Sequence, residues 1–210
     1  MTNSDLARLA DDFWTAFLQH HPTEAHLLGD YRWARKYEDA SRASEDAWIS
    51  DLREVAAQAD AMPTSELDTD DQLTQAVLSS TATAYADVLE TRLSELSVDP
   101  IFGIQTQVPI VLGMVGLPDA EVAEAMLDKL RGVATQYDQR IERLREGISS
   151  GRVPARFAIA DTITQLDAEL ALPLSESPVL RAVPAPPAGV DEAAWRDRVR
   201  AVFADAVAPA

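Results

Sequence analysis

Apolar residues recur every three or four positions along most of the chain, the spacing of an amphipathic helix. The first such segment runs from Ser4 to Leu18, with Asn3 or Ser4 as its N-cap. A short second helix begins at Pro22, which favours the first helical turn, and ends at Gly29, which readily adopts a left-handed conformation. The stretch between these two helices is therefore interpreted as a turn.

The next two segments predict longer helices. The stretch over residues 41–62 places Trp48 and Leu52 on one face, with Ser44 as N-cap, and ends before Pro63. Thr69 and Gln72 have the spacing of a capping box, from which a helix of about 28 residues could run to Leu96. Its expected apolar positions are Leu73, Ala76, Val77, Ala84, Val88, Leu89, Leu93 and Leu96.

The second half of the chain predicts further helices separated by proline and glycine. Residues 98–118 break the helical rhythm and indicate a buried connector with one short helix. A charged amphipathic helix then extends from Asp119 to Gly151, with a potential break at Gly132, and another runs from Pro154 to Pro173. The apolar residues of the helix from Pro154 to Pro173 are Phe157, Ile159, Ile163, Leu166 and Leu170.

A proline-rich loop over about residues 173–189 precedes a last helix after Asp191. The expected buried side of this helix holds Trp195, Val199, Val202, Phe203 and Val207, which either fold back on the chain or form an exposed apolar patch. No segment alternates with the period of a strand. The pattern predicts an all-α fold, an antiparallel multi-helix assembly with one or two long helices, forming a single domain over residues 1–210.

Composition and charge narrow the classes of partner. The net charge of -17 makes nucleic acid and anionic membranes poor partners, because phosphate-binding surfaces need clustered Lys and Arg. Residues 1–100 hold 20 acidic and 7 basic side chains, so most of the acidic excess lies there. We interpret it as a solvated helical surface rather than as a surface that steers a cationic ligand. The absence of cysteine, of a signal peptide and of a long apolar run predicts a soluble, cytoplasmic protein.

Candidate chemistry concentrates between residues 20 and 33, in the sequence HHPTEAHLLGDYRW. His21 and His26 are five residues apart, about 140° around a helix, and Pro22 interrupts the helix between them. We therefore predict polar residues at helix ends and no metal site. Asp30 and Arg32 have two open interpretations: pairing or backbone capping, which we favour, and contact with a substrate.

Other motifs point to structure rather than catalysis. The run ELDTDD, residues 66–71, lacks the glycine and the final glutamate of a calcium-binding loop, and is interpreted as an acidic helix N-terminus. The sequence contains no nucleotide-binding glycine loop, zinc-binding HExxH motif or nucleophile elbow. No catalytic residue is predicted in this chain.

Two stretches in combination resemble the bacterial, helical family known as domain of unknown function 885. The sequence FWTAFLQHHPTEAHLLGDYRW is similar to its N-terminal pattern of an aromatic helix, a proline, Leu-Gly-Asp and an arginine. YDQRIERLREGISSGRVPARFAIADTITQLD resembles its helix pair joined by a Gly-x-x-Pro turn, and FADAVAPA is similar to the segment where members continue into a further helical half.

The resemblance implies a zinc-dependent, peptidase-like hydrolase whose His-Glu-x-x-x-Gly-His segment lies in a later half. That segment does not occur in these residues, so we expect no cofactor in this chain, while zinc belongs to the full-length context. The chain would be the N-terminal helical part, forming a wall or lid of a substrate cleft, with Asp30 and Arg32 as substrate contacts. Its expected partner is a C-terminal catalytic half or a peptide ligand. The alternative is a stand-alone interaction module whose acidic first half binds a basic protein or peptide.

Overall fold

The computed structural model describes residues 3–209, which form helices joined by turns and loops, with no strand among them. The prediction of an all-α fold is confirmed. Two compact units divide the chain: unit 1 comprises Met1–His20 and Ala40–Leu93, and unit 2 comprises His21–Asp39 and Ser94–Ala210. The single domain over residues 1–210 stays a prediction, since a domain can contain more than one compact unit.

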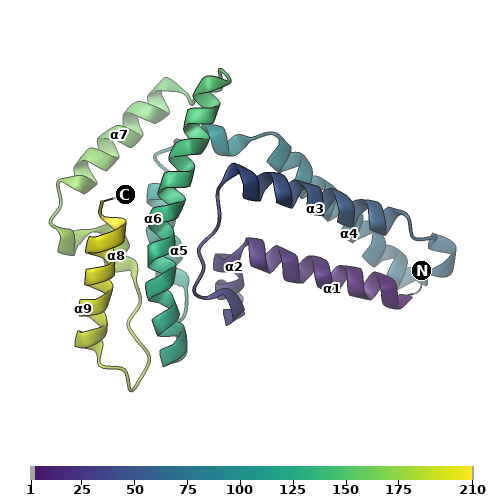
Figure 1. Cartoon of the computed structure of the whole chain (residues 1–210), viewed down its shortest axis with the longest axis horizontal. Coiled ribbons are helices and arrows are strands. Elements are labelled where there is room, and N and C mark those ends of the chain that lie inside the picture. Colours follow the sequence, from purple (N-terminus) through teal and green to yellow (C-terminus); the bar gives the residue numbers. More distant parts are fainter. Residues whose placement is uncertain (1–2, 210) are drawn as a thin grey trace. The chain divides into compact units, whose positions relative to one another are not determined.

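Unit 1 is built from three helices, α1 (Asn3–His20), α3 (Arg42–Asp60) and α4 (Thr69–Glu90) (Figure 1). Helices α3 and α4 lie side by side, joined by a short 3-10 turn at Thr64–Glu66, and α1 packs against both. Its core contains Leu6, Leu9, Ala59, Met62, Leu67 and Leu78. Trp48 is buried beside this core and stacks on the rings of Phe13 and His20.

The structure corrects the predicted helix starts in unit 1. Helix α3 is capped by Ser41, whose hydroxyl accepts a hydrogen bond from the backbone N–H of Ser44, so the helix starts earlier than predicted. Helix α4 is capped by Asp68, whose carboxylate accepts from the N–H of Asp71, rather than by Thr69. Helix α1 already includes Asn3 and Ser4, so the prediction that one of them is its N-cap is wrong.

Helix α4 also differs from the prediction in its length and its buried face. It ends at Glu90, and Arg92 follows with a positive φ of 59°, before a 3-10 turn at Leu93–Leu96. The buried positions are Gln75, Leu78, Ala82 and Ala86. The predicted stripe of Leu73, Val77 and Val88 is instead exposed.

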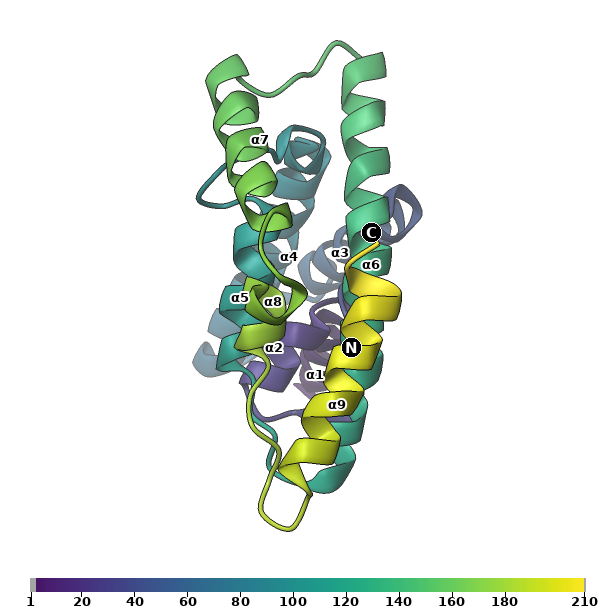
Figure 2. The same ribbon diagram turned by 90° about the vertical axis from the view of Figure 1, so that its left-hand side faces the viewer.

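Unit 2 contains the short helix α2 (Pro22–Leu27) and the helices α5 (Ile104–Met114) and α6 (Ala120–Ser149). It continues with α7 (Arg156–Leu170), α8 (Pro178–Ala182) and α9 (Glu192–Val202), which a π-helical turn at Phe203–Val207 extends. Figure 2 shows α9 beside α6, and shows α7 joined to the far end of α6 by a loop. Short 3-10 turns occur at Tyr31–Trp33 and Leu174–Glu176.

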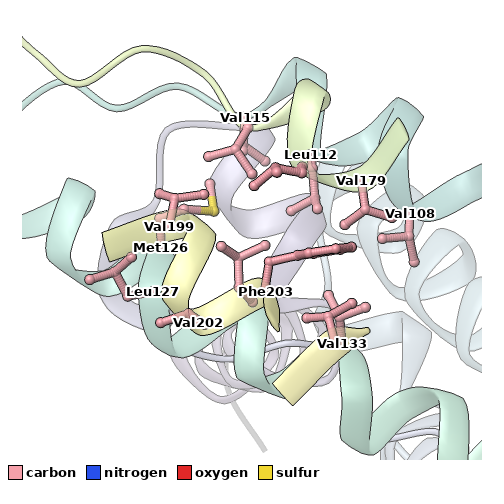
Figure 3. Close-up of a cluster of buried hydrophobic side chains, with 14 of the residues drawn as sticks. Val108, Leu112, Val115, Met126, Leu127, Val133, Val179, Val199, Val202 and Phe203 are labelled. Atoms are coloured by element: carbon pink, nitrogen blue, oxygen red, sulfur yellow. The ribbon is translucent and has the colours of Figure 1, made fainter. Parts of the chain in front are cut away.

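The core of unit 2 lies where α5, α6, α8 and α9 converge. Figure 3 shows side chains from these helices pointing toward one another, including Leu112, Met126, Val179 and Phe203. Trp195 and Val199 of α9 are also buried in this core. The last helix therefore folds back on the chain, as one of the two expected outcomes.

Several predictions for unit 2 are confirmed and others are corrected. Pro22 begins α2, Gly29 follows it with φ of 83°, and the connector over residues 98–118 contains one short helix, α5. That connector is only partly buried, since Ile101, Phe102, Ile110 and Met114 are exposed. Helix α6 runs without interruption through Gly132, so the suggested break there is wrong. The proline-rich loop is not entirely irregular, because it contains α8.

Helix α7 forms as predicted, but most of its apolar residues face outward. Only Ala158 and Thr162 of this helix are buried, whereas Phe157, Ile163, Leu166 and Leu170 are exposed. The helix is held to α5 partly by polar contacts, since the amide of Gln165 bonds with Gln105 and with the hydroxyl of Thr106.

Candidate functional site

A buried polar cluster in unit 2 is centred on Lys129, in the first half of α6. Its side chain is 0% exposed, and Nζ donates hydrogen bonds to the carbonyl oxygen of Lys36 at 2.6 Å and to Oγ1 of Thr23 at 3.3 Å. Burial lowers its pKa from 10.5 to about 8, and the nearby Glu38 carboxylate opposes that shift. Lys129 is thus a buried ammonium group that the fold keeps partnered.

Residues 34–39 lie along α6 and bring the Glu38 carboxylate to this position. The chain contacts successive turns of the helix, through Arg35 with Asp128 and through Asp39 with Gln139. Between these contacts the backbone approaches Gly132 so closely that a Cβ there would lie 2.8 Å from Cβ of Tyr37. A residue with a side chain would push this segment away, so Gly132 fixes the position of Tyr37 and Glu38.

Both oxygens of Glu38 are held by Thr23. The backbone N–H and the hydroxyl of Thr23 each donate to one carboxylate oxygen, at 2.8 Å. The neighbouring Tyr37 has its pKa raised by burial and by the Glu38 charge, so its phenol stays protonated at neutral pH. Thr23, Tyr37 and Glu38 therefore form a rigid polar wall.

This wall borders a pocket of about 240 Å³ between α5, α6 and residues 23–38. The other lining residues combine polar groups with an apolar surface: Ser97, Phe102, Ile104, Gln107, Val108, Val111, Gln136 and Arg140. Hydrogen-bonding groups distributed over an apolar surface are typical of small-molecule sites. We therefore identify this pocket as the candidate functional site.

Asp30 and Arg32 form a close ion pair with each other. The guanidinium group donates to both carboxylate oxygens of Asp30, with its shortest bond at 2.6 Å, and the backbone N–H of Arg32 is capped by the same carboxylate. Hydrogen bonding to Arg32 lowers the pKa of Asp30. Arg32 also lies over the ring of Trp33. The favoured pairing is present, and their contact with a substrate stays a prediction.

The three histidines take separate structural positions. His20 stacks on Trp48, and the carbonyl of His21 accepts the first backbone hydrogen bond of α2 from Ala25. His26 is buried; its Nε2–H donates to the carbonyl of Gly116 at 2.7 Å, and desolvation lowers its pKa. Among the described residues no cluster of three or more His, Asp or Glu side chains could hold a metal ion.

Sequence reasoning missed most residues of the candidate site. Lys129, Gln136 and Arg140 were not singled out, although Lys129 and Gln136 share the phase of the apolar residues Met126 and Val133. A polar side chain within an apolar helical stripe is the signal that could have identified them. The pocket itself could not be predicted, because its lining comes from three separated segments of the chain.

Comparison with known proteins gives a family without a described activity. A family model for a bacterial protein of unknown function (DUF885) matches residues 22–210. No curated protein and no solved structure matches the chain. In the described part of the chain, no helix is long and apolar enough to cross a membrane. Because the family model covers most of the sequence, including every residue that lines the pocket, this chain belongs to the DUF885 family.

Proposed function

We propose that this chain is a helical scaffold forming a wall or lid of the substrate cleft in a metal-dependent, peptidase-like hydrolase, without catalytic residues of its own. The catalytic zinc site would belong to a later half, attached C-terminally or supplied as a separate chain, as the resemblance of the sequence implies. The chain would thus be the N-terminal portion of that architecture.

The observation that carries this proposal is the outward apolar face of α7. Ile163, Leu166 and Leu170 share one side of the helix, and Leu170 is 79% exposed. The side of α7 that faces α5 is partly polar, because Gln165 makes hydrogen bonds with residues of α5. A surface helix normally directs its polar side outward, so this arrangement suits a helix that packs against further polypeptide.

Asp30 and Arg32 are the substrate contacts in this proposal. Their ion pair is partly exposed and bidentate, which holds a carboxylate and a guanidinium group in a fixed orientation. Such a pair could bind the polar backbone of a peptide without reacting with it.

The test is a measurement of bound zinc after zinc exposure and desalting, together with cleavage of a mixed-peptide library. We expect no stoichiometric zinc and no cleavage from the chain alone. One tightly held zinc per chain, or clear turnover, would contradict a non-catalytic scaffold. Reading the coding sequence beyond position 210 tests the architecture, because the proposal requires an adjoining or separate segment with the zinc-binding motif.

The alternative, an acidic interaction module, is favoured by the surface of unit 1. Residues 1–20 and 40–93 hold 14 acidic and 4 basic side chains. All four of these arginines are ion-paired with acidic residues of the same unit; they are Arg8, Arg42, Arg53 and Arg92. The exposed apolar face of α4, with Leu73, Val77 and Val88, lies on this acidic unit. A basic amphipathic helix has the complementary pattern.

A binding titration separates this alternative from the scaffold. A basic amphipathic helical peptide should bind the chain with strong salt dependence, while the same peptide with its Lys residues replaced by Glu should not. Val77→Glu should weaken binding of the basic peptide through loss of apolar contact. Equal binding of both peptides, or of neither, would contradict the interaction module.

A further inference from the structure

The pocket of unit 2 contains two glutamine side chains that make no hydrogen bond with the described chain. Gln136 of α6 is only 6% exposed, and Gln107 of α5 is partly buried; both line the pocket. Among the described residues, the buried polar atoms that lack a partner include no atom of these two amides, so both amides are open to the water of the pocket. A ligand that enters the pocket can replace this water and accept hydrogen bonds from the amides.

Other buried glutamines of this protein are satisfied by the fold. The side-chain amide of Gln75 donates to the carbonyl oxygens of Ala59 and Met62, at 2.7 and 2.8 Å. Gln105 donates to the carbonyl of Asp99. Gln136 and Gln107 differ from these two residues, because their side chains line the pocket and have no hydrogen-bond partner in the described chain.

The charges around the pocket favour an anion, although the whole chain carries a net charge of -17. Arg140, which also has an interaction partner within the chain, lines the pocket, and the buried Lys129 ammonium group lies behind Thr23. Glu38 is the acidic residue among the lining side chains, and both its oxygens already accept hydrogen bonds from Thr23. Ile104, the first residue of α5, also lines the pocket, which places the positive end of that helix dipole at its wall.

The rest of the lining limits the size and character of a ligand. Phe102, Val108 and Val111 contribute apolar surface to the lining. The volume of about 240 Å³ is below the range of roughly 300–1,000 Å³ that is usual for drug-sized ligands. The site therefore suits a few heavy atoms with one charged end.

We propose that this pocket binds a small carboxylate with a short apolar body. Arg140 and the amides of Gln136 and Gln107 bind the carboxylate, and the apolar body lies against Phe102 and Val108. The same chemistry is presented by a free carboxylic acid and by the C-terminal residue of a peptide. This inference does not depend on the scaffold function, which can hold whether or not the pocket is occupied.

The test is a titration of the isotopically labelled chain, followed by NMR, with three probes. These are 4-methylpentanoate, its uncharged primary amide, and the dipeptide alanyl-leucine. Saturable shifts of the Gln107 and Gln136 side-chain amide signals are expected with a carboxylate probe and not with the primary amide. Tighter binding of the dipeptide would assign the site to a peptide C-terminus, and tighter binding of 4-methylpentanoate to a free acid.

A matched pair of variants tests the role of the amide. Gln136→Met keeps the size of the side chain and should weaken carboxylate binding roughly tenfold, the effect of one hydrogen bond to a charged group. Gln58→Met changes an exposed glutamine of unit 1 that does not line the pocket, and should bind as the unaltered chain does. Without ligand, Gln136→Met should leave the melting temperature close to that of the unaltered chain, because the amide is open to water and makes no hydrogen bond with the described chain.

Several results would overturn the proposal. No saturable binding of either carboxylate, or equal binding of the primary amide, would exclude a carboxylate site. Unchanged affinity in Gln136→Met would show that this amide does not contact the ligand. A lower melting temperature of ligand-free Gln136→Met would show that the amide has a structural partner. None of these outcomes depends on zinc or on peptide cleavage, so failure here is distinct from failure of the scaffold proposal.

Discussion

At the scale of single residues, Lys129 is the position where the fold and the ionic state of the protein are most tightly coupled. Its ammonium group joins α6 to the carbonyl of Lys36 and the hydroxyl of Thr23, in surroundings that water does not reach. Burial disfavours the protonated form of Lys129. The nearby Glu38 carboxylate favours that form by a smaller amount, and the ring of Tyr37 also lies near the ammonium group. A buried lysine of this kind makes stability depend on pH.

Lys129 should make the protein more stable as the pH rises above 8. Below pH 8 the lysine is protonated in both states; above it the native state loses the proton, while the unfolded state keeps it up to about pH 10.5. The unfolded state then binds more protons, so the free energy of unfolding rises, by about 2 kcal/mol between pH 7 and 9.5. Urea unfolding at several pH values measures this change, and Lys129→Met should lack it.

Lys36→Met is the control, since Lys36 is exposed and its substitution should retain the gain. The comparison stops below pH 10, because burial raises the pKa of Tyr37 and of Tyr137, and ionisation of unfolded tyrosines then lowers stability. If the unaltered chain and Lys129→Met change in parallel up to pH 9.5, the coupling is absent.

Gly132 should tolerate no side chain, although it lies inside a helix. Alanine has the higher helix propensity, but its Cβ would meet Tyr37 at 2.8 Å, and overpacking of this kind costs about 1–3 kcal/mol. Gly132→Ala should therefore lower the melting temperature. Gly113→Ala is the matched control, because the nearest atom to its Cβ would be the carbonyl oxygen of Ala182, at 3.8 Å. A Gly132→Ala protein as stable as Gly113→Ala would refute the close approach.

At the scale of helices, local signals determined which elements form, while tertiary packing determined where they begin and which side is buried. The apolar period identified α1, α3, α6 and α9 correctly, because each buries most of its apolar stripe, although Ile141 and Ile148 of α6 are exposed. It failed on α4, where leucine and valine at helical spacing face outward and alanines pack inward. The hydrophobicity of alanine is too small to indicate which side of a helix is buried. Its small side chain nevertheless allows α3 to lie close to α4.

Helix starts were misplaced for a related reason. Ser41 and Ser44 are both good capping residues, and so are Asp68 and Thr69. Only the course of the preceding backbone decides which of two neighbouring candidates adopts the extended conformation of a cap. The pocket could not be predicted from local sequence signals, because Gln107 and Gln136 come together only when α5 and α6 pack against each other.

Substitution of the two serines distinguishes the caps directly. Ser41→Ala should lower the free energy of unfolding by about 1 kcal/mol, because the N–H of Ser44 loses its acceptor. Ser44→Ala should have little effect or a small stabilising one, since Ser44 lies inside the helix, where alanine is favoured. Chemical denaturation of both variants gives the comparison. A larger loss in Ser44→Ala would restore the predicted start at Ser44.

At the scale of the whole molecule, each unit has its own buried core. Leu52 lies in unit 1 and Leu130 in unit 2, and both side chains are fully buried. Replacing either by alanine leaves a cavity and should cost about 2–5 kcal/mol. The loss should appear first within the unit that carries the substitution.

Hydrogen exchange followed by mass spectrometry measures this effect unit by unit. Leu52→Ala should speed exchange in α3 and α4 more than in α5 and α6, and Leu130→Ala should do the reverse. Uniform acceleration across both units by either variant would indicate a single cooperative unit. That result would favour the one domain predicted from the sequence.

The interleaving of the two units has a consequence for folding on the ribosome. Residues 21–39 belong to unit 2, but they are synthesised between the two segments of unit 1. Their partners Gly116, Lys129 and Gly132 emerge only after unit 1 is complete. The nascent chain must therefore keep an unfinished loop available while the helices around it fold, and Glu38 reaches its final place only after α6 has left the exit tunnel.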